Sequence, residues 1–318
     1  MALELLKKTD AKKGFFAIEK IGLLYTLFTS VVIVLLFGRM ERPMGMLFER
    51  LIIVAATLAL IWVYRQYACK LTAFLRTAYQ MALLAYWYPD TYEFNRLFPN
   101  LDHLFASCEQ AIFHCQPAIL FSQYCSSAWF CEAFNLGYFS YYPMIFGIAL
   151  FYFFCRYREF DKVAFVLVTS FFVYYLIYLF LPVAGPQYYF PAIGLDQVAQ
   201  AHFPAIGDYF NYHAELLPSK EPDWGIFYKL VEMSQQAGER PTAAFPSSHV
   251  GMSTIILLLA FRAKKSLFWC LMPFYVLLCC ATVYIQAHYL IDAIAGFFTA
   301  FLIYAFAMWL YGRMERVG

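Results

Sequence analysis

Two ionisable side chains lie within an apolar stretch near the C-terminal end of the chain. His288 and Asp292 belong to the stretch TVYIQAHYLIDAIAGFF, residues 282–298. Because they are four residues apart, a helix would place them on one face. A carboxylate in that position accepts the N–H of one ring nitrogen, which fixes the tautomer and leaves the other nitrogen more nucleophilic. The pair therefore predicts a histidine nucleophile that is oriented by Asp292.

A second histidine follows a serine-rich helix start. The stretch AAFPSSHVGMSTIILLLAF, residues 243–261, places Pro246, Ser247 and Ser248 directly before an apolar run, as helix starts require. Backbone N–H groups and the positive end of the helix dipole together favour a bound phosphate at such a start. We predict that Ser247 and Ser248 hold phosphate oxygens and that His249 faces the bound group.

Three other interpretations of these residues have to be weighed. A single histidine near a helix end is more often an interfacial residue than a catalyst, but here two histidines lie on the same predicted face. Two histidines and an aspartate would also suit zinc; the serine-rich start favours an anion instead, so no metal and no cofactor is predicted. A proton relay in a transporter needs such residues near the middle of the membrane, whereas His249 and His288 are predicted at one membrane edge.

The composition predicts the elements that position these residues. Of the 318 residues, 63% are hydrophobic and only 14% are charged, too few polar residues for the surface of a soluble domain. The net charge of +2 argues against nucleic acid as a partner. We predict an all-α, polytopic transmembrane helical bundle, with the membrane bilayer itself as a partner.

Apolar runs long enough to cross a bilayer occur at 21–37, 50–64, 136–155, 163–182, 247–261, 266–287 and 289–311. A weaker candidate at 71–88 is interrupted by Arg76 and Gln80. Residues 92–132 predict re-entrant or interfacial helices. Within the long 183–246 loop, an amphipathic helix is predicted around residues 226–231.

Basic residues predict the orientation, because they favour cytoplasmic loops. Four clusters flank the apolar runs: Lys7, Lys8, Lys12, Lys13 and Lys20; Arg156, Arg158 and Lys162; Arg262, Lys264 and Lys265; and Arg313 and Arg316. With both termini cytoplasmic the number of crossings is even, which makes 71–88 the eighth span. The 183–246 loop and His288 then face the extracytoplasmic side.

Four of the nine cysteines form a cluster in sequence, Cys108, Cys115, Cys125 and Cys131. Their spacing fits none of the common zinc patterns. One or two disulfides, or free thiols, remain open for this segment.

The two histidine stretches together resemble a known family. PSSH at 246–249 and AHYLID at 287–292 look like the second and third signature motifs of the type-2 phosphatidate phosphatase superfamily, which includes vanadium haloperoxidases, sphingomyelin synthases and inositol phosphorylceramide synthases. The resemblance covers roughly residues 182–300. It implies a six-helix catalytic core, which we place within residues 133–318, after N-terminal spans and interfacial helices in residues 1–132.

The resemblance also implies roles for the three ionisable residues. His288 would take the phosphoryl group as a phosphohistidine, Asp292 would orient that histidine, and His249 would protonate the leaving group. No metal is implied.

The chain departs from the phosphatase branch where that branch carries cations. Thr282 stands where the phosphatases have an arginine, and the stretch PVAGPQYYFPAIG offers Gln187 in place of basic residues. The cation nearest the serine motif is Arg240, so we predict Arg240 and Gln187 as substrate-binding residues. A phosphodiester carries one negative charge, whereas a monoester carries nearly two and is usually held by several cations. Fewer cations therefore favour a diester.

These departures, with the pairing of FPSSHV and HYLID, most resemble the inositol phosphorylceramide and sphingomyelin synthase branch. The predicted function is transfer of a phospho-headgroup from a phospholipid to a lipid hydroxyl such as that of ceramide. The alternative enzyme is a lipid-phosphate phosphatase acting on phosphatidate or polyprenyl diphosphate.

Overall fold

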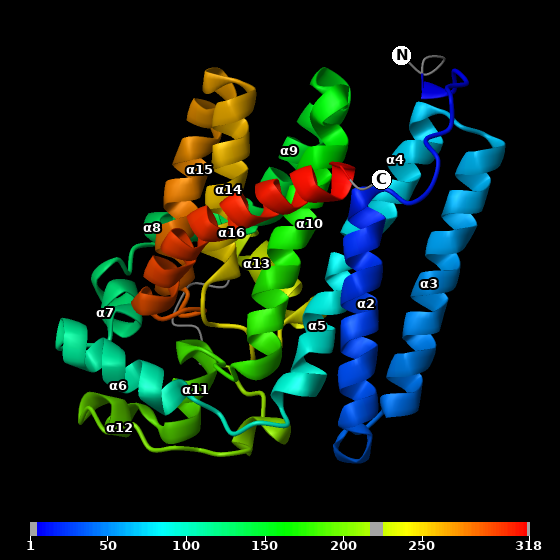
Figure 1. Ribbon diagram of the computed structural model, residues 1–318. Coiled ribbons are helices and arrows are strands. Elements are labelled where there is room, and N and C mark those ends of the chain that lie inside the picture. The colour runs from blue at the N-terminus through cyan, green and yellow to red at the C-terminus, as the bar shows by residue number, and fades with distance from the viewer. Residues whose placement is uncertain (1–4, 217–224, 317–318) are drawn as a thin grey trace.

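The structure is a computed structural model that describes residues 5–216 and 225–316. This part of the chain consists of helices and their connections and contains no β-strand. The prediction of an all-α bundle is therefore confirmed. The bundle is built from long helices that run between two ends, with short helices gathered at one of these ends (Figure 1).

The N-terminal helices form a group beside the rest of the bundle (Figure 1). Helices α2 (Ala17–Leu35) and α3 (Pro43–Gln66) form a hairpin, which the short 3₁₀ helix η1 (Phe37–Arg39) joins. The predicted run at 71–88 is divided between α4 (Lys70–Ala82) and α5 (Leu84–Asn95). The eighth candidate span is thus helical, but it is interrupted between these two helices.

The polar residues within α4 have buried partners on α2 and α3. Arg76 Nε and Nη2 donate hydrogen bonds to the two carboxylate oxygens of Glu19, each at 2.6 Å. Gln80 Nε2 donates to Thr57 Oγ1 at 3.1 Å. Because a buried charge needs a partner, these contacts explain how α4 carries an arginine in an apolar setting.

Short helices follow in the segment that the sequence predicts as re-entrant or interfacial. They are α6 (Asp102–Phe113) and α7 (Pro117–Tyr124). Next come α8 (Ala128–Phe139) and α9 (Tyr141–Cys155), which are bent relative to each other by 40°. Helix α6 lies at the end of the bundle away from the N-terminus (Figure 1).

Helix α10 (Tyr157–Phe180) is the central helix, since most of its side chains are buried. It packs against α14 (Ser248–Ala263) and α16 (Leu290–Arg316), and α15 (Lys265–Tyr284) packs against α14. The buried aromatic and aliphatic side chains of α10 and α14 join in one hydrophobic core.

The segment between α10 and α14 contains α11 (Pro186–Ile193), α12 (Leu195–Ala199), the 3₁₀ helix η2 (Tyr209–Asn211) and α13 (Ile226–Gly238). Helix α13 is the amphipathic helix predicted from the sequence. Of the residues predicted on its apolar face, Val231 is buried and Phe227 and Leu230 are half-buried, but Ile226, at the start of the helix, is exposed.

Five of the described helices are long and apolar enough to cross a membrane: α2, α3, α10, α15 and α16. The bent pair α8–α9 makes a sixth if it is one span, and α14 is apolar but shorter, at 16 residues. These helices support an integral membrane protein. The count of eight crossings remains a prediction.

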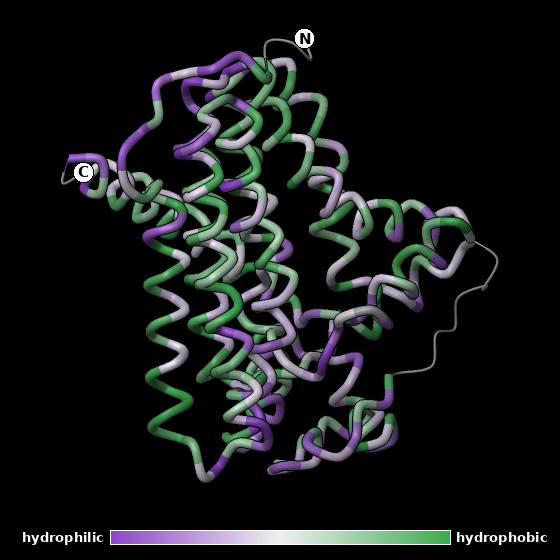
Figure 2. The backbone as a smooth tube through the Cα atoms, turned by 90° about the vertical axis from the view of Figure 1, so that its right-hand side faces the viewer, coloured by the Kyte–Doolittle hydropathy of each residue, from purple (hydrophilic) through white to green (hydrophobic). Residues whose placement is uncertain are grey.

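The basic clusters meet at one end of the bundle. Lys12 Nζ contacts Glu315 Oε1 at 2.9 Å, and Arg262 Nε lies 3.7 Å from Glu159 Oε2. This is the end at which the chain begins, whereas α6, α11 and α12 lie at the opposite end (Figure 1). Hydrophilic stretches gather near the N-terminus, and hydrophobic residues predominate along the long helices (Figure 2).

Candidate active site

Two connections bring the histidine stretches together: the start of α14 and the turn between α15 and α16. Helix α15 ends at Tyr284, and Gln286 adopts a left-handed conformation with φ +65°. The His288 N–H then donates to the Thr282 carbonyl at 3.0 Å, which turns the chain back on itself. The Ser247 N–H donates to the Asp292 carbonyl at 3.0 Å, so the two stretches are joined directly.

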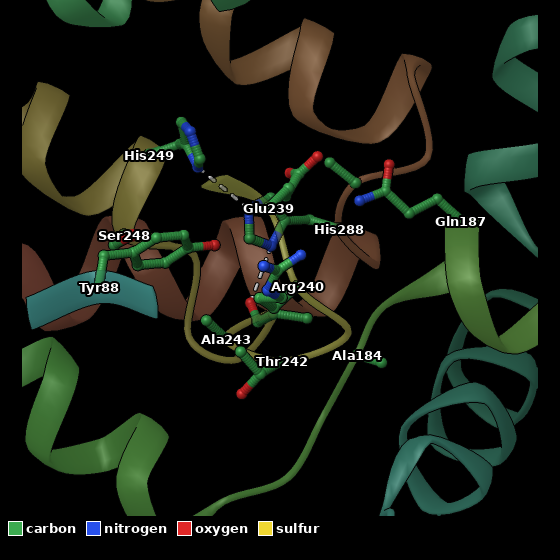
Figure 3. A pocket seen from close by; sticks show the side chains of 12 residues that line it. Tyr88, Ala184, Gln187, Glu239, Arg240, Thr242, Ala243, Ser248, His249 and His288 are labelled. Atoms are coloured by element: carbon green, nitrogen blue, oxygen red, sulfur yellow. Dashed lines mark hydrogen bonds between the residues drawn. The ribbon is translucent and has the colours of Figure 1, made fainter. Parts of the chain in front are cut away.

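The two histidine rings face each other across this junction. His288 Nε2 lies 3.4 Å from His249 Nδ1 (Figure 3). On its other side, His288 Nδ1 lies 2.8 Å from the carbonyl oxygen of Ala244. A carbonyl oxygen only accepts, so Nδ1 of His288 carries the proton and Nε2 has the lone pair; this tautomer is inferred from the hydrogen bonds. Nε2 is therefore the nucleophilic nitrogen, and it points toward His249.

Asp292 lies behind His288 but does not make the hydrogen bond that the four-residue spacing predicts. Its Oδ2 is 3.8 Å from His288 Nδ1 and accepts the Tyr289 N–H at 2.8 Å. The reason is that α16 begins at Leu290, so His288 precedes the helix and helical spacing does not apply to it. The Ala244 carbonyl orients the ring, and Asp292 contributes a fully buried carboxyl nearby.

Burial lowers the pKa of His288 to about 4, against the opposing effects of the Ala244 carbonyl and of Glu239. The ring is thus neutral at ordinary pH, which is the form that can act as a nucleophile.

Aromatic rings hold His249 in place. The ring of Tyr138 stacks on it with centroids 4.7 Å apart, and that of Tyr141 packs against it at 4.4 Å. These two rings fix the orientation of the His249 imidazole toward His288.

The two serines differ in position. Ser247 is fully buried and caps α14, because its Oγ accepts the Val250 N–H at 3.3 Å. Ser248 lines the cavity between the histidines, and its N–H donates to the Tyr178 hydroxyl at 3.0 Å. The structure thus brings Ser248, but not Ser247, into the lining of this cavity.

Both predicted substrate-binding residues line this cavity. Arg240 is exposed and Gln187 is buried (Figure 3). The cavity between them has a volume of only about 10 Å³, roughly the room that one water molecule needs. Any group larger than a water molecule enters this cavity only if the side chains around the histidines move.

Glu239 also lines the cavity, beside His288, and was missed in the sequence (Figure 3). Its Oε1 accepts a hydrogen bond from the Tyr138 hydroxyl at 3.3 Å, and burial raises its pKa. The signal was available, because Glu239 directly precedes Arg240 in ERPTAAFPSSH.

Two buried acids of α6 form hydrogen bonds with the segments that carry the site. Asp102 accepts hydrogen bonds from the N–H groups of Ala184 and Gly185, at 2.6 and 2.8 Å, and from the Tyr289 hydroxyl at 3.1 Å. Glu109 accepts the N–H of Ile291 at 3.1 Å. Seven residues separate these acids, which places them on one face of a helix, and this spacing was the only sequence signal for them.

The sequence leaves open whether the cysteines between residues 108 and 131 form disulfides, and it predicts no metal site. Within residues 5–216 and 225–316, no three or more His, Cys, Asp or Glu side chains are grouped in a way that could hold a metal ion. Cys108, Cys115 and Cys125 are free thiols. The disulfides considered for this segment are therefore not formed.

The comparison with known families covers most of this site. Residues 104–306, more than half of the chain, match the family described as the PAP2 superfamily. The matched range contains both histidine stretches and the acids Glu239 and Glu109. No curated protein and no solved structure matches the chain. The matched range and the paired histidines agree, and the chain belongs to the PAP2 superfamily.

Proposed function

We propose that this protein is a lipid phosphotransferase, which moves a phospho-headgroup from a phospholipid to the hydroxyl of a second lipid through a phosphohistidine on His288. Membership of the PAP2 superfamily supports a phosphatase-type lipid phosphoesterase or phosphotransferase in general. The scarcity of positive charge in the cavity around His288 favours a phosphodiester as the substrate.

Cations are scarce in this cavity. Among the described residues, Arg240 is the one lysine or arginine that lines it, and the carboxyl of Glu239 lies beside it. Thr282, which stands in the arginine position of the phosphatases, is fully buried and its hydroxyl donates to the Cys279 carbonyl. A dianionic monoester would need more positive charge than this. A singly charged diester is the better match.

The proposed reaction has two steps. Nε2 of His288 attacks phosphorus, so that a P–N bond forms and the P–O bond to the first lipid alcohol breaks, while His249 gives its proton to that oxygen. The hydroxyl of the acceptor lipid then loses its proton to His249 and attacks phosphorus, and the P–N bond breaks. His249 is returned to its protonated form and His288 to its neutral form.

Substrate binding requires the two rings to separate. At 3.4 Å, His288 Nε2 and His249 Nδ1 are in direct contact, and phosphorus has to enter between His288 and the leaving oxygen that His249 protonates. Arg240 is exposed and has a flexible side chain, so it can follow the phosphate as the cavity opens.

The test is a transfer assay with purified protein, using headgroup-labelled phosphatidylinositol with and without ceramide. We expect label on ceramide only when both lipids are present, and slow hydrolysis of phosphatidate. Arg240→Ala is expected to lower transfer about a hundredfold, the effect of losing one charge-stabilising group. Arg158→Ala is the matched control at the other end of the bundle.

A phosphatase would give a different result. Rapid hydrolysis of phosphatidate, with no label on ceramide, would replace the transferase by the phosphatase. We further propose that the site faces the extracytoplasmic side, because the histidines lie away from the end that carries the basic clusters. The same position at one end of the helices disfavours a proton relay through mid-membrane.

A further inference from the structure

A second, much larger cavity adjoins the histidine site. It has a volume of about 570 Å³, within the range of about 300–1,000 Å³ that is usual for ligand pockets. Tyr88, Glu239, Ser248 and His249 line both cavities. The large cavity therefore begins at the proposed general acid.

We propose that this cavity holds a hydrocarbon chain of the phosphate-bearing lipid, and that α4 and α5 determine the chain length that the enzyme accepts. The first part names the substrate of the proposed reaction and rests on that function. The second part concerns helices that lie outside the family match at residues 104–306, so it is a property of this chain's own N-terminal helices.

The lining of the cavity has the polarity of such a ligand. Its polar residues gather at one end, where α13 and the start of α14 contribute Ser234, Gln235, Glu239, Ser248 and His249. The remainder is aliphatic and aromatic, up to Phe74 on α4 and Phe160 on α10. A lipid with its phosphate at the histidines and its chain directed toward Phe74 matches this division.

The length of the cavity also suits a chain. Tyr88 and Phe74 both line it and are separated by fourteen positions of α4 and α5. At about 1.5 Å per residue this corresponds to roughly 20 Å. One leaflet of a bilayer contributes about 15 Å of hydrocarbon, so a long acyl chain fits along this wall.

An entrance lies on the side of α9. Tyr142, Phe146 and Leu150 recur every four residues on this helix, line the cavity and are exposed. Ala82 and Ala85 on the opposite wall are exposed as well. A chain can thus enter sideways from the membrane, while Phe171 and Tyr175 on α10 form a buried inner wall.

The two histidines assign the chain to the leaving alcohol. His249 lines the large cavity, whereas His288 lines only the small one. When His288 attacks phosphorus and His249 protonates the departing oxygen, the lipid alcohol remains on the side of His249, in the apolar cavity. The headgroup stays with the phosphohistidine.

Small side chains on α4 and α5 leave the room for this chain. Ala85 lies three residues from Tyr88, near the histidines, and Ala78 lies ten residues away, near the far end. Ala78→Phe should therefore obstruct only long chains. Ala85→Phe should obstruct long and short chains alike.

The test compares dipalmitoyl and dioctanoyl phosphatidylinositol as substrates of the full-length protein. Ala78→Phe is expected to lower the ratio of kcat/KM for the long over the short lipid by about tenfold or more, the scale on which hydrophobic pockets discriminate. Ala85→Phe should lower kcat/KM for both lipids. Ala59→Phe, on the exposed face of α3, is the matched control and should leave the ratio as in the wild type. If Ala78→Phe left the kcat/KM ratio of the long over the short lipid as in the wild type, α4 would not determine the accepted chain length.

A binding experiment separates this inference from the proposed function, because it needs no turnover. Phosphatidylinositol with a diazirine in the middle of one acyl chain is photolysed with the protein, and the cross-linked peptides are mapped. We expect cross-links at the buried residues Phe171 and Tyr175, and their loss in Ala85→Phe. Cross-links confined to outward residues of α3, such as Leu51 and Trp62, would overturn the chain site. Cross-links at Phe171 without any lipid turnover would retain the site and reject the transferase.

Discussion

At the scale of single residues, the proposed nucleophile His288 and the neighbouring Asp292 should differ in how strongly activity depends on them. His288→Ala should abolish turnover, because no other group can form the P–N bond. Asp292→Asn should leave measurable activity, since the Ala244 carbonyl, at 2.8 Å from Nδ1, still orients the ring. Steady-state kinetics and trapping of a labelled phosphoenzyme check both. Near-normal turnover by His288→Ala would exclude the phosphohistidine.

The acid side of the pH profile should reflect His288. Its pKa is lowered to about 4, so the ring remains unprotonated, and nucleophilic, well below the usual histidine value of about 6.5. Phosphoenzyme formation should therefore persist as the pH falls and be lost only near pH 4. Rapid-quench measurements from neutral pH downward check this. Loss of phosphoenzyme formation near pH 6.5 would contradict the lowered pKa of this ring.

The alkaline side should reflect Glu239. Burial raises the pKa of its carboxyl, so the group remains neutral to a higher pH than an exposed glutamate. Above its pKa the ionised carboxylate repels an anionic phosphate, and activity should fall as the pH rises. Glu239→Gln cannot ionise, so its profile should retain only the decline that follows from loss of the proton on His249. If the alkaline decline of activity were unaltered in Glu239→Gln, ionisation of Glu239 would not affect the reaction.

At the scale of helices, the pair between α2 and α4 should be a large contribution to stability. Glu19→Ala or Arg76→Ala leaves the other charge buried without its partner, at a cost of about 3–5 kcal/mol. The double variant Glu19→Leu with Arg76→Met should be less destabilised than either single one. Thermal unfolding in mild detergent checks this, with the exposed pair Arg42 and Glu49 as a control worth less than about 1 kcal/mol.

Should the double variant unfold as readily as the single variants, the unpaired charge would not be the cause. The packing of Arg76 over the rings of Phe16 and Tyr64, at 3.7 and 4.7 Å, would then be the main contribution. Helix α4 also forms a wall of the proposed lipid cavity. Partial loosening of α4 should therefore broaden the range of accepted chains before the protein unfolds.

At the scale of the whole molecule, the orientation in the membrane can be measured directly. In a background without native cysteines, a cysteine placed at Gln200, directly after α12, should react with a membrane-impermeant thiol reagent added from outside. One at Lys264, between α14 and α15, should react only after the membrane is opened. The reverse pattern would place the histidine site on the cytoplasmic side.

Much of the architecture follows from the sequence alone. Every apolar run marked in the sequence is helical, because a chain in hydrocarbon has to satisfy its backbone hydrogen bonds within each segment. The runs at 71–88 and 136–155 are each divided between two helices. The sequence also predicts His249 and His288 as site residues, because each lies in a short motif, PSSH at 246–249 and AHYLID at 287–292. The Arg76 position weakened one predicted span, and the structure shows the reason in its partner Glu19.

Only the tertiary structure decided which groups surround the histidines. The Ala244 carbonyl lies 44 positions from His288, and Asp102 lies 187 positions from Tyr289, so no local spacing reveals these contacts. Nδ1 of His288 bonds to the Ala244 carbonyl and not to Asp292, because α16 begins only at Leu290. The proposed lipid cavity arises only when α4, α9 and α10 are placed side by side. Side-chain types and local periodicity determine the helices and identify the two histidines, whereas packing between distant segments determines the geometry of the site.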